Sequence, residues 1–524
     1  RLSIPYFVAS RFLPDSAMVF IDSSGCCIGG LRVLLPWRFQ KTRSSLKHPY
    51  RHLIVSSPDR RVMDRYEVGK VLGEGGFGVA RSVLCIQSGR TCVMKSINRS
   101  GMPNVGALLD EAEIHIELDH PYIVRVFETF TDQSRLHIVM ELCRGGDLCD
   151  WLFDGPSPRS CSEPEARHIF GHMMHAVNYV HCQEVAHRDL KLENFLLKEP
   201  ADGDLTTCVV KLIDFGLATR FTPDKRMRTI CGSSMYMAPE MFSSSGYDEK
   251  CDVFSSGVIL YALLSGRMPF DGDSSDDVCE QVRFAPLEFE ESEWRHVSRK
   301  GRNLVSRMCL KDPERRMDVS QILKTNWLRE PEEGNYIDDV ALKAFVQHAR
   351  EYSEKDVVSQ MVLNLAAYNT DDSQLGNLRD IFMFLDSDAD GKLSKEDFRQ
   401  RLGELLPDLR GDGFLNKLFE EAAMDGSGML DYTEFITIAM DPATCLSREA
   451  CCEAFHALEG LCKGQISASK LHEAVQDCHS AEWMDRHREE VQATFTDFDG
   501  RDLNLDEFLS RLYIPNVLGA IGGA

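Results

Sequence analysis

The octet His187-Arg188-Asp189-Leu190-Lys191-Leu192-Glu193-Asn194 places an acid, a cation and an amide close together in the chain. Asp189 can accept the proton of a hydroxyl nucleophile, and Asn194 can offer a neutral oxygen to a divalent cation. Lys191 lies between them, where its charge would meet negative charge that develops on a transferred group. An octet can match by accident, so its meaning depends on what precedes and follows it.

A glycine-rich stretch precedes the octet, directly after a predicted strand over residues 66–72. It reads Gly73-Glu74-Gly75-Gly76-Phe77-Gly78-Val79, and its glycines let backbone amides approach phosphate oxygens without side-chain obstruction. The next predicted strand, over residues 91–95, ends on Lys95. A lysine in this place after a glycine loop is the candidate for binding the α- and β-phosphates of ATP.

Two more motifs follow the octet. Asp214-Phe215-Gly216 ends a predicted strand over residues 209–213, and Ala238-Pro239-Glu240 comes after it. Asp-Phe-Gly alone is a common turn, but all these motifs in this order resemble the protein kinases. The resemblance implies an α+β, two-lobed kinase fold over residues 66–328, with phosphoryl transfer from ATP. It makes four residues catalytic, namely Asp189, Lys191, Asn194 and Lys95, and gives Mg²⁺ the ligands Asn194 and Asp214.

The kinase resemblance also assigns the anion that orients the lysine and the residues that hold adenine. A predicted helix over residues 108–118 carries Glu111, which the resemblance selects as the partner of the lysine, with Glu113 as the alternative. Met140 and Glu141, at the end of a predicted strand, resemble the gatekeeper and the hinge. The expected ATP-binding residues are therefore Gly73, Gly75, Gly78, Val79, Lys95, Glu111, Met140 and Glu141.

Several residues bear on substrate choice and regulation. Lys191 directly after His-Arg-Asp-Leu resembles serine/threonine kinases. Asp147 and Glu193 match positions where basophilic kinases contact substrate arginines, and arginine–carboxylate pairing is the physical reason. Either acid can instead be merely solvated, and Asp147 is also placed to reach the ribose. Thr229 occupies a position that is phosphorylated in related kinases, where a phosphate could pair with Arg188; the alternative is an ordinary loop threonine.

The C-terminal part of the chain repeats itself. Four apolar residues recur at intervals of 36 or 37 positions: Leu393, Leu430, Ile466 and Leu503. Each is followed four positions later by one of Asp397, Glu434, Lys470 and Glu507. This is the spacing between the apolar eighth position of an EF-hand loop and the twelfth position that closes the cation site. We therefore expect an all-α, calmodulin-like domain of four EF-hands over residues 370–515.

The four predicted loops differ in their ligands. Loop one has a nearly complete calcium set: Asp386, Asp388, Asp390, the carbonyl of Lys392, Ser394 and Asp397. Its aspartate at the twelfth position is shorter than the usual glutamate, which bears on affinity and on discrimination against Mg²⁺. Loop two begins with Ala423, so binding and absence of binding stay equally open; its candidates are Asp425, Ser427, the carbonyl of Met429, Asp431 and Glu434. Loops three and four lack ligands at key positions and are expected to be structural.

Residues 329–369 join the two domains. Apolar residues recur there at helical spacing, from Phe345 to Leu365, and are mixed with basic side chains. This pattern predicts a helix over residues 336–368 that blocks the kinase in one state and lies in an EF-hand groove in another. A plain linker helix is the alternative.

Composition limits the remaining choices. The 524 residues carry a net charge of −23, which disfavours nonspecific nucleic-acid binding and suits basic peptides or cations as partners. Eighteen cysteines form no C-x-x-C pair, a pattern typical of reduced thiols in a cytoplasmic protein. No apolar run reaches the roughly 20 residues of a membrane span. The basic segment 1–65 is expected to be disordered or a mispredicted leader, and membrane contact through it stays undetermined; residues 516–524 form a tail.

A kinase domain, a junction helix and four EF-hands, in this order, resemble the calcium-dependent protein kinases of plants and protists. The resemblance spans about residues 66–512. It implies protein substrates with basic residues near the phosphoacceptor, ATP, Mg²⁺ and Ca²⁺ as ligands, and autoinhibition that Ca²⁺ relieves through an intramolecular contact of the junction helix with the EF-hands. Two alternatives are a catalytically inactive scaffold, against which the intact motifs argue, and a kinase whose EF-hands form a structural or docking module without calcium control.

Overall fold

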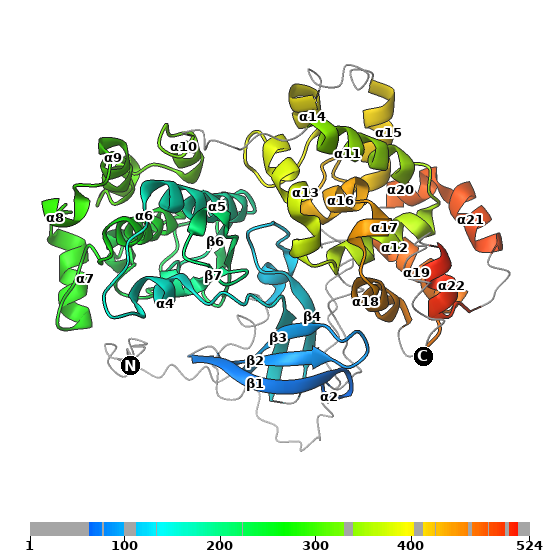
Figure 1. Cartoon of the computed structure of the whole chain (residues 1–524), viewed down its shortest axis with the longest axis horizontal. Helices are drawn as coiled ribbons and strands as arrows, with labels where there is room; N and C mark the ends of the chain where they lie inside the picture. Colours follow the sequence, from blue (N-terminus) through cyan, green and yellow to red (C-terminus); the bar gives the residue numbers. More distant parts are fainter. Residues whose placement is uncertain are drawn as a thin grey trace, which may run out of the picture.

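The computed structural model describes residues 62–75, 78–98, 112–132, 134–222, 224–329, 339–402, 412–424, 426–459, 464–479, 481–497 and 502–511. Several predictions lie wholly or partly outside these residues, among them the basic segment 1–65 except for its last four residues, the lysine partner Glu111, the loop-two candidate Asp425, the start of the junction helix and the tail 516–524. Figure 1 shows a twisted sheet at the bottom, a helical lobe on the left and a second helical module on the right.

A five-stranded antiparallel sheet forms the N-terminal lobe. Its order is β1-β2-β3-β5-β4, after the short helix α2 (Val62–Arg65). The strands are β1 (Tyr66–Gly75), β2 (Gly78–Cys85), β3 (Thr91–Asn98), β4 (Val126–Thr131) and β5 (Arg135–Met140). Gly75 pairs with Gly78, so the glycine-rich stretch is the tip of the β1–β2 hairpin. Strand β2 also pairs with β3, where Ala80 lies opposite Lys95, and this pairing brings the lysine close to the glycine hairpin.

The C-terminal lobe of the kinase part is mainly helical. Its helices are α4 (Leu148–Phe153), α5 (Glu163–Cys182), α6 (Lys250–Ser265), α7 (Ser275–Phe284), α8 (Glu291–Trp294), α9 (Arg299–Met308) and α10 (Val319–Leu323). Short strands and 3-10 turns carry the motifs between α5 and α6: β6 (Val185–Ala186), η2 (Leu192–Asn194), β7 (Phe195–Leu197), η3 (Leu205–Thr207), β8 (Val210–Leu212), β9 (Thr219–Arg220) and η4 (Pro239–Phe242). A last turn, η5 (Pro313–Arg315), precedes α10.

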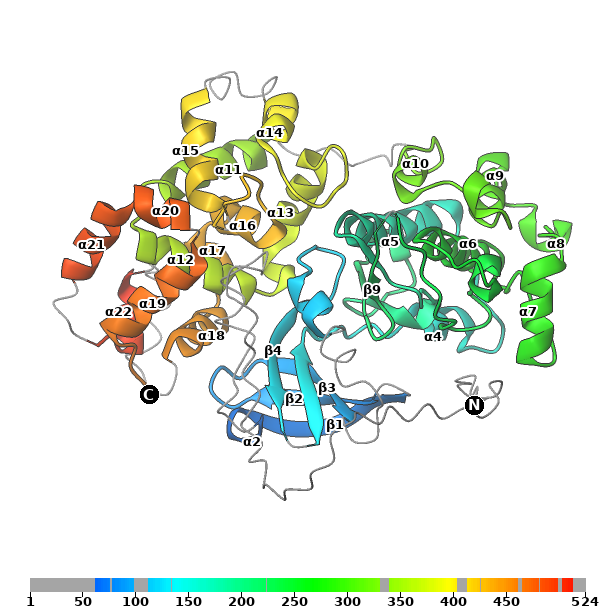
Figure 2. The ribbon, with the colours of Figure 1, turned by 180° about the vertical axis from the view of Figure 1, so that it is seen from behind.

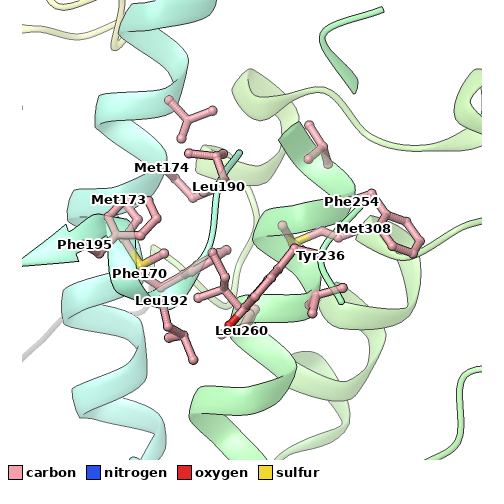
Figure 3. Packing of buried hydrophobic residues seen from close by; sticks show 14 of the residues in the cluster. Phe170, Met173, Met174, Leu190, Leu192, Phe195, Tyr236, Phe254, Leu260 and Met308 are labelled. Atoms are coloured by element: carbon pink, nitrogen blue, oxygen red, sulfur yellow. The ribbon is translucent and has the colours of Figure 1, made fainter. Parts of the chain in front are cut away.

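The catalytic octet is anchored in the core of this lobe. Leu190 and Leu192 are fully buried, and Figure 3 shows them among side chains of α5 and α6 such as Phe170 and Leu260. Helix α5 begins at a capping box in which Ser162 and Glu165 each bind the other's backbone amide. The apolar residues of the octet thus fix the positions of the polar residues that alternate with them.

The second helical module contains four helix–loop–helix units. Its helices are α11 (Asp339–Tyr352), α12 (Val357–Tyr368), α13 (Asp372–Leu385), α14 (Lys395–Leu402), α15 (Asp412–Ala422), α16 (Tyr432–Ala439), α17 (Pro442–Cys445), α18 (Arg448–Glu459), α19 (Ala468–Cys478), α20 (Ala481–Arg486), α21 (Arg488–Asp497) and α22 (Leu505–Arg511). The four repeated apolar residues pair two by two, Leu393 with Leu430 and Ile466 with Leu503. The four repeated positions thus lie in pairs, as they do where EF-hand loops are joined two by two.

The junction differs from the prediction. Instead of one helix over residues 336–368, the structure has two, α11 and α12, with a turn at residues 353–356. Asp356 caps α12 through the amides of Val358 and Ser359, and such a cap begins a new helix rather than continuing the old one. Every residue of α12 is buried, so this segment lies within the EF-hand module, as the prediction has it for one of its two states.

The sheet and the EF-hand module share one hydrophobic core. Buried residues of the sheet, among them Tyr66, Met94 and Phe130, belong to the same cluster as Met361 and Leu365 of α12. Figure 2 shows the module beside β4 and beside α5 of the helical lobe. Within the described residues, no helix is both long and apolar enough to cross a bilayer.

Candidate active site and calcium loops

The polar residues of the octet converge. Lys191 Nζ lies 3.1 Å from Asp189 Oδ2, and the amide of Asn194 donates to the Asp189 carbonyl at 2.7 Å. Ser233 donates to Asp189 Oδ1 through both its amide and its hydroxyl, at 3.0 and 2.9 Å. All three octet residues are buried. The sequence did not single out Ser233, since no motif marks it; only the fold brings the activation segment onto the octet.

A buried aspartate fixes the backbone of the octet. Both carboxylate oxygens of Asp252, on α6, accept hydrogen bonds at 2.8 Å, one from the amide of His187 and one from the amide of Arg188. Arg188 has φ +67°, a left-handed conformation that costs free energy for a residue other than glycine. The two bonds from a rigid helix hold this conformation in place.

The lysine of β3 and the aspartate of Asp-Phe-Gly meet. Lys95 Nζ lies 2.6 Å from Asp214 Oδ1. Burial raises the pKa of Asp214, but the attraction to Lys95 outweighs it, and the net shift of this pKa is downward. Asp214 is therefore a carboxylate at neutral pH, which is the form that binds a metal ion.

The hinge follows β5. Met140 is buried at the end of that strand. The carboxylate of Glu141 is turned away from the cleft, because it pairs with Lys198 at 2.7 Å and with Lys211 at 3.0 Å. The amide of Glu141 is also occupied, by the Arg125 carbonyl at 2.9 Å. Of the polar groups of Glu141, only the backbone carbonyl is thus left to accept a hydrogen bond from adenine; the side chain and the backbone amide already have partners.

Cys143 is a hinge residue that the sequence prediction missed. The amides of Arg144 and Gly145 donate to Lys198 and Leu197, whereas the described residues offer no partner for the amide of Cys143. An amide without a partner at the hinge can donate a hydrogen bond to a ring nitrogen of adenine. Only the position of Cys143 in the hinge could have predicted this donor, since every residue type except proline has a backbone amide.

Loop one gathers three carboxylates. Asp386, Asp388 and Asp390 each place an oxygen within 4.8 Å of the others, and Asp386 is buried. Burial, followed by repulsion from Asp390, raises the pKa of Asp386 to about 8. Burial and repulsion from Asp388 raise the pKa of Asp390 to about 6. Carboxylates that oppose each other's ionisation in this way are stabilised when a cation neutralises them.

Loop two has the same frame with different side chains. Its bridge to loop one consists of two hydrogen bonds between Leu393 and Leu430, at 2.8 and 2.9 Å. The carboxylate of Glu434 accepts hydrogen bonds from the amides of Met424 and Asp431, at 2.9 and 3.0 Å. Among the described residues, only loop one forms a cluster of three metal-ligand side chains.

Comparison with known proteins places this geometry in a family. The protein kinase domain model matches residues 66–328, and an EF hand model matches residues 378–402. Calcium-dependent protein kinase 2 of Zea mays is 31% identical over 88% of this chain and 89% of its own length. Calcium-dependent protein kinase 33 of Arabidopsis thaliana is 30% identical over 92% and 90%, and calcium-dependent protein kinase 5 of Plasmodium falciparum 29% identical over 85% and 78%.

This chain belongs to the calcium-dependent protein kinase family. As a protein kinase it uses ATP and Mg²⁺, and its own residues fit that pair. Asp214 supplies an ionised carboxylate, and Asn194 keeps its amide oxygen for a cation because its nitrogen is bound to the octet backbone. In the EF-hand module, the all-oxygen donor set of loop one suits Ca²⁺.

The candidate substrate acids of the kinase lie on the C-terminal lobe. Glu193 has a buried Oε2 atom with no partner in the described part of the chain, and burial raises the pKa of this carboxyl. Asp147 caps α4 by accepting a hydrogen bond from the Asp150 amide at 2.8 Å, and burial raises its pKa as well. Glu193 is therefore the acid that most needs an external cation.

Thr229 lies in the activation segment with an exposed side chain. Its carbonyl accepts a hydrogen bond from the Tyr247 hydroxyl at 2.6 Å, and Arg188 donates to the same hydroxyl at 3.4 Å. Arg188 also binds the Leu217 carbonyl at 2.7 Å. The Tyr247 side chain thus links Thr229 to Arg188, the arginine expected to pair with a phosphate on Thr229.

The EF-hand module is ion-paired to the hinge. Lys198 and Lys211, which hold Glu141, also contact Asp371 (3.4 Å) and Asp372 at the start of α13. Arg125, which precedes β4, donates to the Tyr368 carbonyl at 2.6 Å. These residues are far apart in the sequence, so their charges alone did not predict that they form one largely buried network of ion pairs and hydrogen bonds.

Proposed function

We propose that this kinase transfers the γ-phosphate of ATP to serine or threonine residues of protein substrates, preferentially next to basic residues, and that Ca²⁺ at loop one controls the activity. The observation that carries the proposal is the convergence of Lys95 with Asp214 and of Asp189 with Lys191 and Asn194. The first pair is suited to nucleotide binding, and the second group to the reacting hydroxyl.

Each residue has a role in this proposal. Asp189 orients the substrate hydroxyl and accepts its proton, so Ser233 must first yield its place at Oδ1. Lys191 neutralises charge on the phosphoryl group during transfer. Asp214 and Asn194 would hold Mg²⁺, which would neutralise charge on the β- and γ-phosphates. Lys95 then moves from Asp214 to the phosphates, which replaces one anionic partner by another.

Selection of basic substrates rests on Glu193. A buried carboxylate oxygen without a partner gains free energy when a guanidinium pairs with it. Lys191 beside the base supports serine and threonine as acceptors. The test is phosphorylation of two peptides that differ only in arginines near the acceptor, with kcat/KM as the readout. Equal values for both peptides would refute basophilic selection but not kinase activity.

Calcium control is supported by the position of the EF-hand module. The module holds α12 in its own core and contacts the hinge through Lys198 and Lys211, so a change in the module reaches the junction and the adenine region together. We infer that Ca²⁺ at loop one stabilises this docked arrangement and keeps the junction away from the cleft. Phosphorylation rates across a Ca²⁺/EGTA series at constant Mg²⁺ test this, and equal rates at both ends would refute it.

A second candidate is a kinase whose EF-hand module is structural. One observation favours it: helix α18, in the second pair of EF-hands, is joined to the N-terminal lobe by Glu453, which lies 2.5 Å from Arg65 of α2. Burial acts to raise the pKa of Glu453, but the charges of Arg90 and Arg65 outweigh it and lower this pKa to about 2. Such a contact needs no Ca²⁺. Under this alternative, mutation of loop one leaves the rate unchanged, whereas Glu453→Gln lowers the unfolding temperature.

We also propose a cytoplasmic location. The thirteen cysteines in the described part of the chain are all free thiols, and seven of them are buried. Free thiols persist in a reducing compartment. Fractionation of tagged protein tests the location, and recovery with the membrane fraction would refute it.

A further inference from the structure

Loop one lies directly against helix α5 of the kinase. The side-chain amide of Asn178 donates a hydrogen bond to the carbonyl of Ala389 at 2.5 Å. Gly391 packs on the neighbouring residue of α5, since a Cβ atom there would lie only 2.4 Å from Cδ2 of Tyr179. The kinase therefore touches the backbone between the calcium ligands, not a remote face of the module.

The touched backbone is the part of loop one that is hardest to form. Ala389 has φ +61° and Gly391 has φ +78°. A left-handed alanine is unfavourable by itself, so an outside contact that fixes its carbonyl stabilises the turn. Asp388 and Asp390 flank this alanine, and their spacing depends on the turn. Asn178 thus supports the geometry of two ligands without being a ligand.

The contact is specific to loop one among the loops described at this position. Gly428 and Gly464 have φ values of +73° and +82°, but a Cβ atom on either would meet nothing within 4 Å. Loop two is touched by the kinase elsewhere, where Asp119 accepts a hydrogen bond from the Thr433 amide at 2.9 Å. Among the described parts of the loops, only that of loop one is touched by the kinase at the cation-binding turn itself.

Helix α5 leads from this contact to the catalytic octet. His181, one turn after Asn178, lies 2.9 Å from Asp252, the residue that holds the amides of His187 and Arg188. Helix α5 ends at Cys182, a few residues before the octet. A rigid helix therefore connects the loop-one turn with the catalytic loop over a short path.

We propose that Asn178 is a positioning residue through which the kinase lobe holds loop one in its calcium-binding conformation. The proposal rests on loop one being the calcium site of the proposed function. By linkage, Ca²⁺ then strengthens the contact of loop one with α5 by the same factor by which this contact strengthens Ca²⁺ binding. The kinase lobe is part of the sensor and not only its target.

The test uses the full-length chain with Asn178→Ala and with Asn178→Leu, which keeps most of the volume but removes the donor. Asn303→Ala, at an exposed position on α9, is the matched control. Calorimetric Ca²⁺ titration should show a Kd raised about five- to tenfold in both Asn178 variants, as expected for one lost hydrogen bond. The Ca²⁺ midpoint of peptide phosphorylation should shift equally, while the rate at saturating Ca²⁺ returns to that of the control. Thermal unfolding in EGTA verifies that the variants are folded.

The outcomes separate this inference from the proposed function. A Kd within twofold of the Asn303→Ala control in both variants would overturn the role of Asn178 and leave calcium control intact. A raised Kd with phosphorylation rates that do not respond to Ca²⁺ in any variant would support the role of Asn178 but refute calcium control. A lower rate at saturating Ca²⁺ with an unchanged Kd would make Asn178 merely structural and would also overturn the inference.

Discussion

The catalytic cleft and loop one are both clusters of carboxylates, but the protein treats them in opposite ways. In the cleft, Asp189 and Asp214 each face a lysine of the chain, and the pKa of Asp214 is lowered. In loop one, acids face one another, and the pKa of Asp386 is raised to about 8. In the cleft, lysines of the chain offset the charge of the acids, whereas in loop one the acids repel one another.

The largest effect is expected from the cleft. Asp189→Asn removes the proton acceptor and should lower kcat for peptide phosphorylation by about 10²- to 10⁴-fold. Calcium affinity should stay within twofold of the wild type, because the cleft does not supply ligands to loop one. Steady-state kinetics and calorimetry on the same preparation measure both. A large change in calcium affinity would contradict the separation of the two clusters.

The mirror variant addresses loop one. Asp386→Asn removes the most buried ligand and should weaken Ca²⁺ binding by about 100-fold or more, while the calcium-independent rate is retained. The unfolding temperature in EGTA at pH 8 should not fall, because the variant relieves repulsion among the acids. Differential scanning calorimetry checks this point. A clear loss of stability in EGTA would mean that these carboxylates are already neutralised within the chain.

The two clusters should also differ in their response to pH. The pKa of Asp386 in the folded protein is about 8, above the ordinary value of 3.8. Protonation of Asp386 therefore contributes stability to the calcium-free fold that is fully present below pH 3.8 and is lost as the pH rises through about 8. Calcium must displace this proton, so affinity should fall about tenfold or more from pH 8 to pH 6, with proton release on binding. ATP affinity should change less, because the pKa of Asp214 is lowered. Equal pH dependence of both affinities would argue against the contrast.

Glu193 sharpens the comparison, because it lies at the cleft and its buried Oε2 atom has no hydrogen-bond partner among the described residues. Glu193→Gln should raise KM for an arginine-containing peptide by about tenfold with little change in kcat. A peptide without arginine should be unaffected. Asp154→Asn, at an exposed position directly after α4, is the control. An equal rise in KM for both peptides would show that Glu193 shapes the lobe instead of binding substrate.

The sequence allowed most of the cleft and the repeat of the EF-hands to be predicted, because both rest on local motifs with fixed spacing. Lys95 and Asp214 meet as the kinase resemblance implies. The break of the junction at residues 353–356 was missed, since the apolar pattern runs through it and only the cap at Asp356 marks it. The role of Glu141 and the contact of Asn178 with Ala389 were also not predictable, because each depends on residues distant in the chain.

The most direct test of the whole interpretation measures bound calcium and phosphorylation rate on one sample of the full-length chain, over the same free Ca²⁺ range at constant Mg²⁺. We predict that the rate rises with occupancy of loop one, that the two midpoints coincide, and that Asp386→Asn abolishes both responses together. Calcium that binds with no change in rate, or a rate that responds equally in Asp386→Asn, would contradict it.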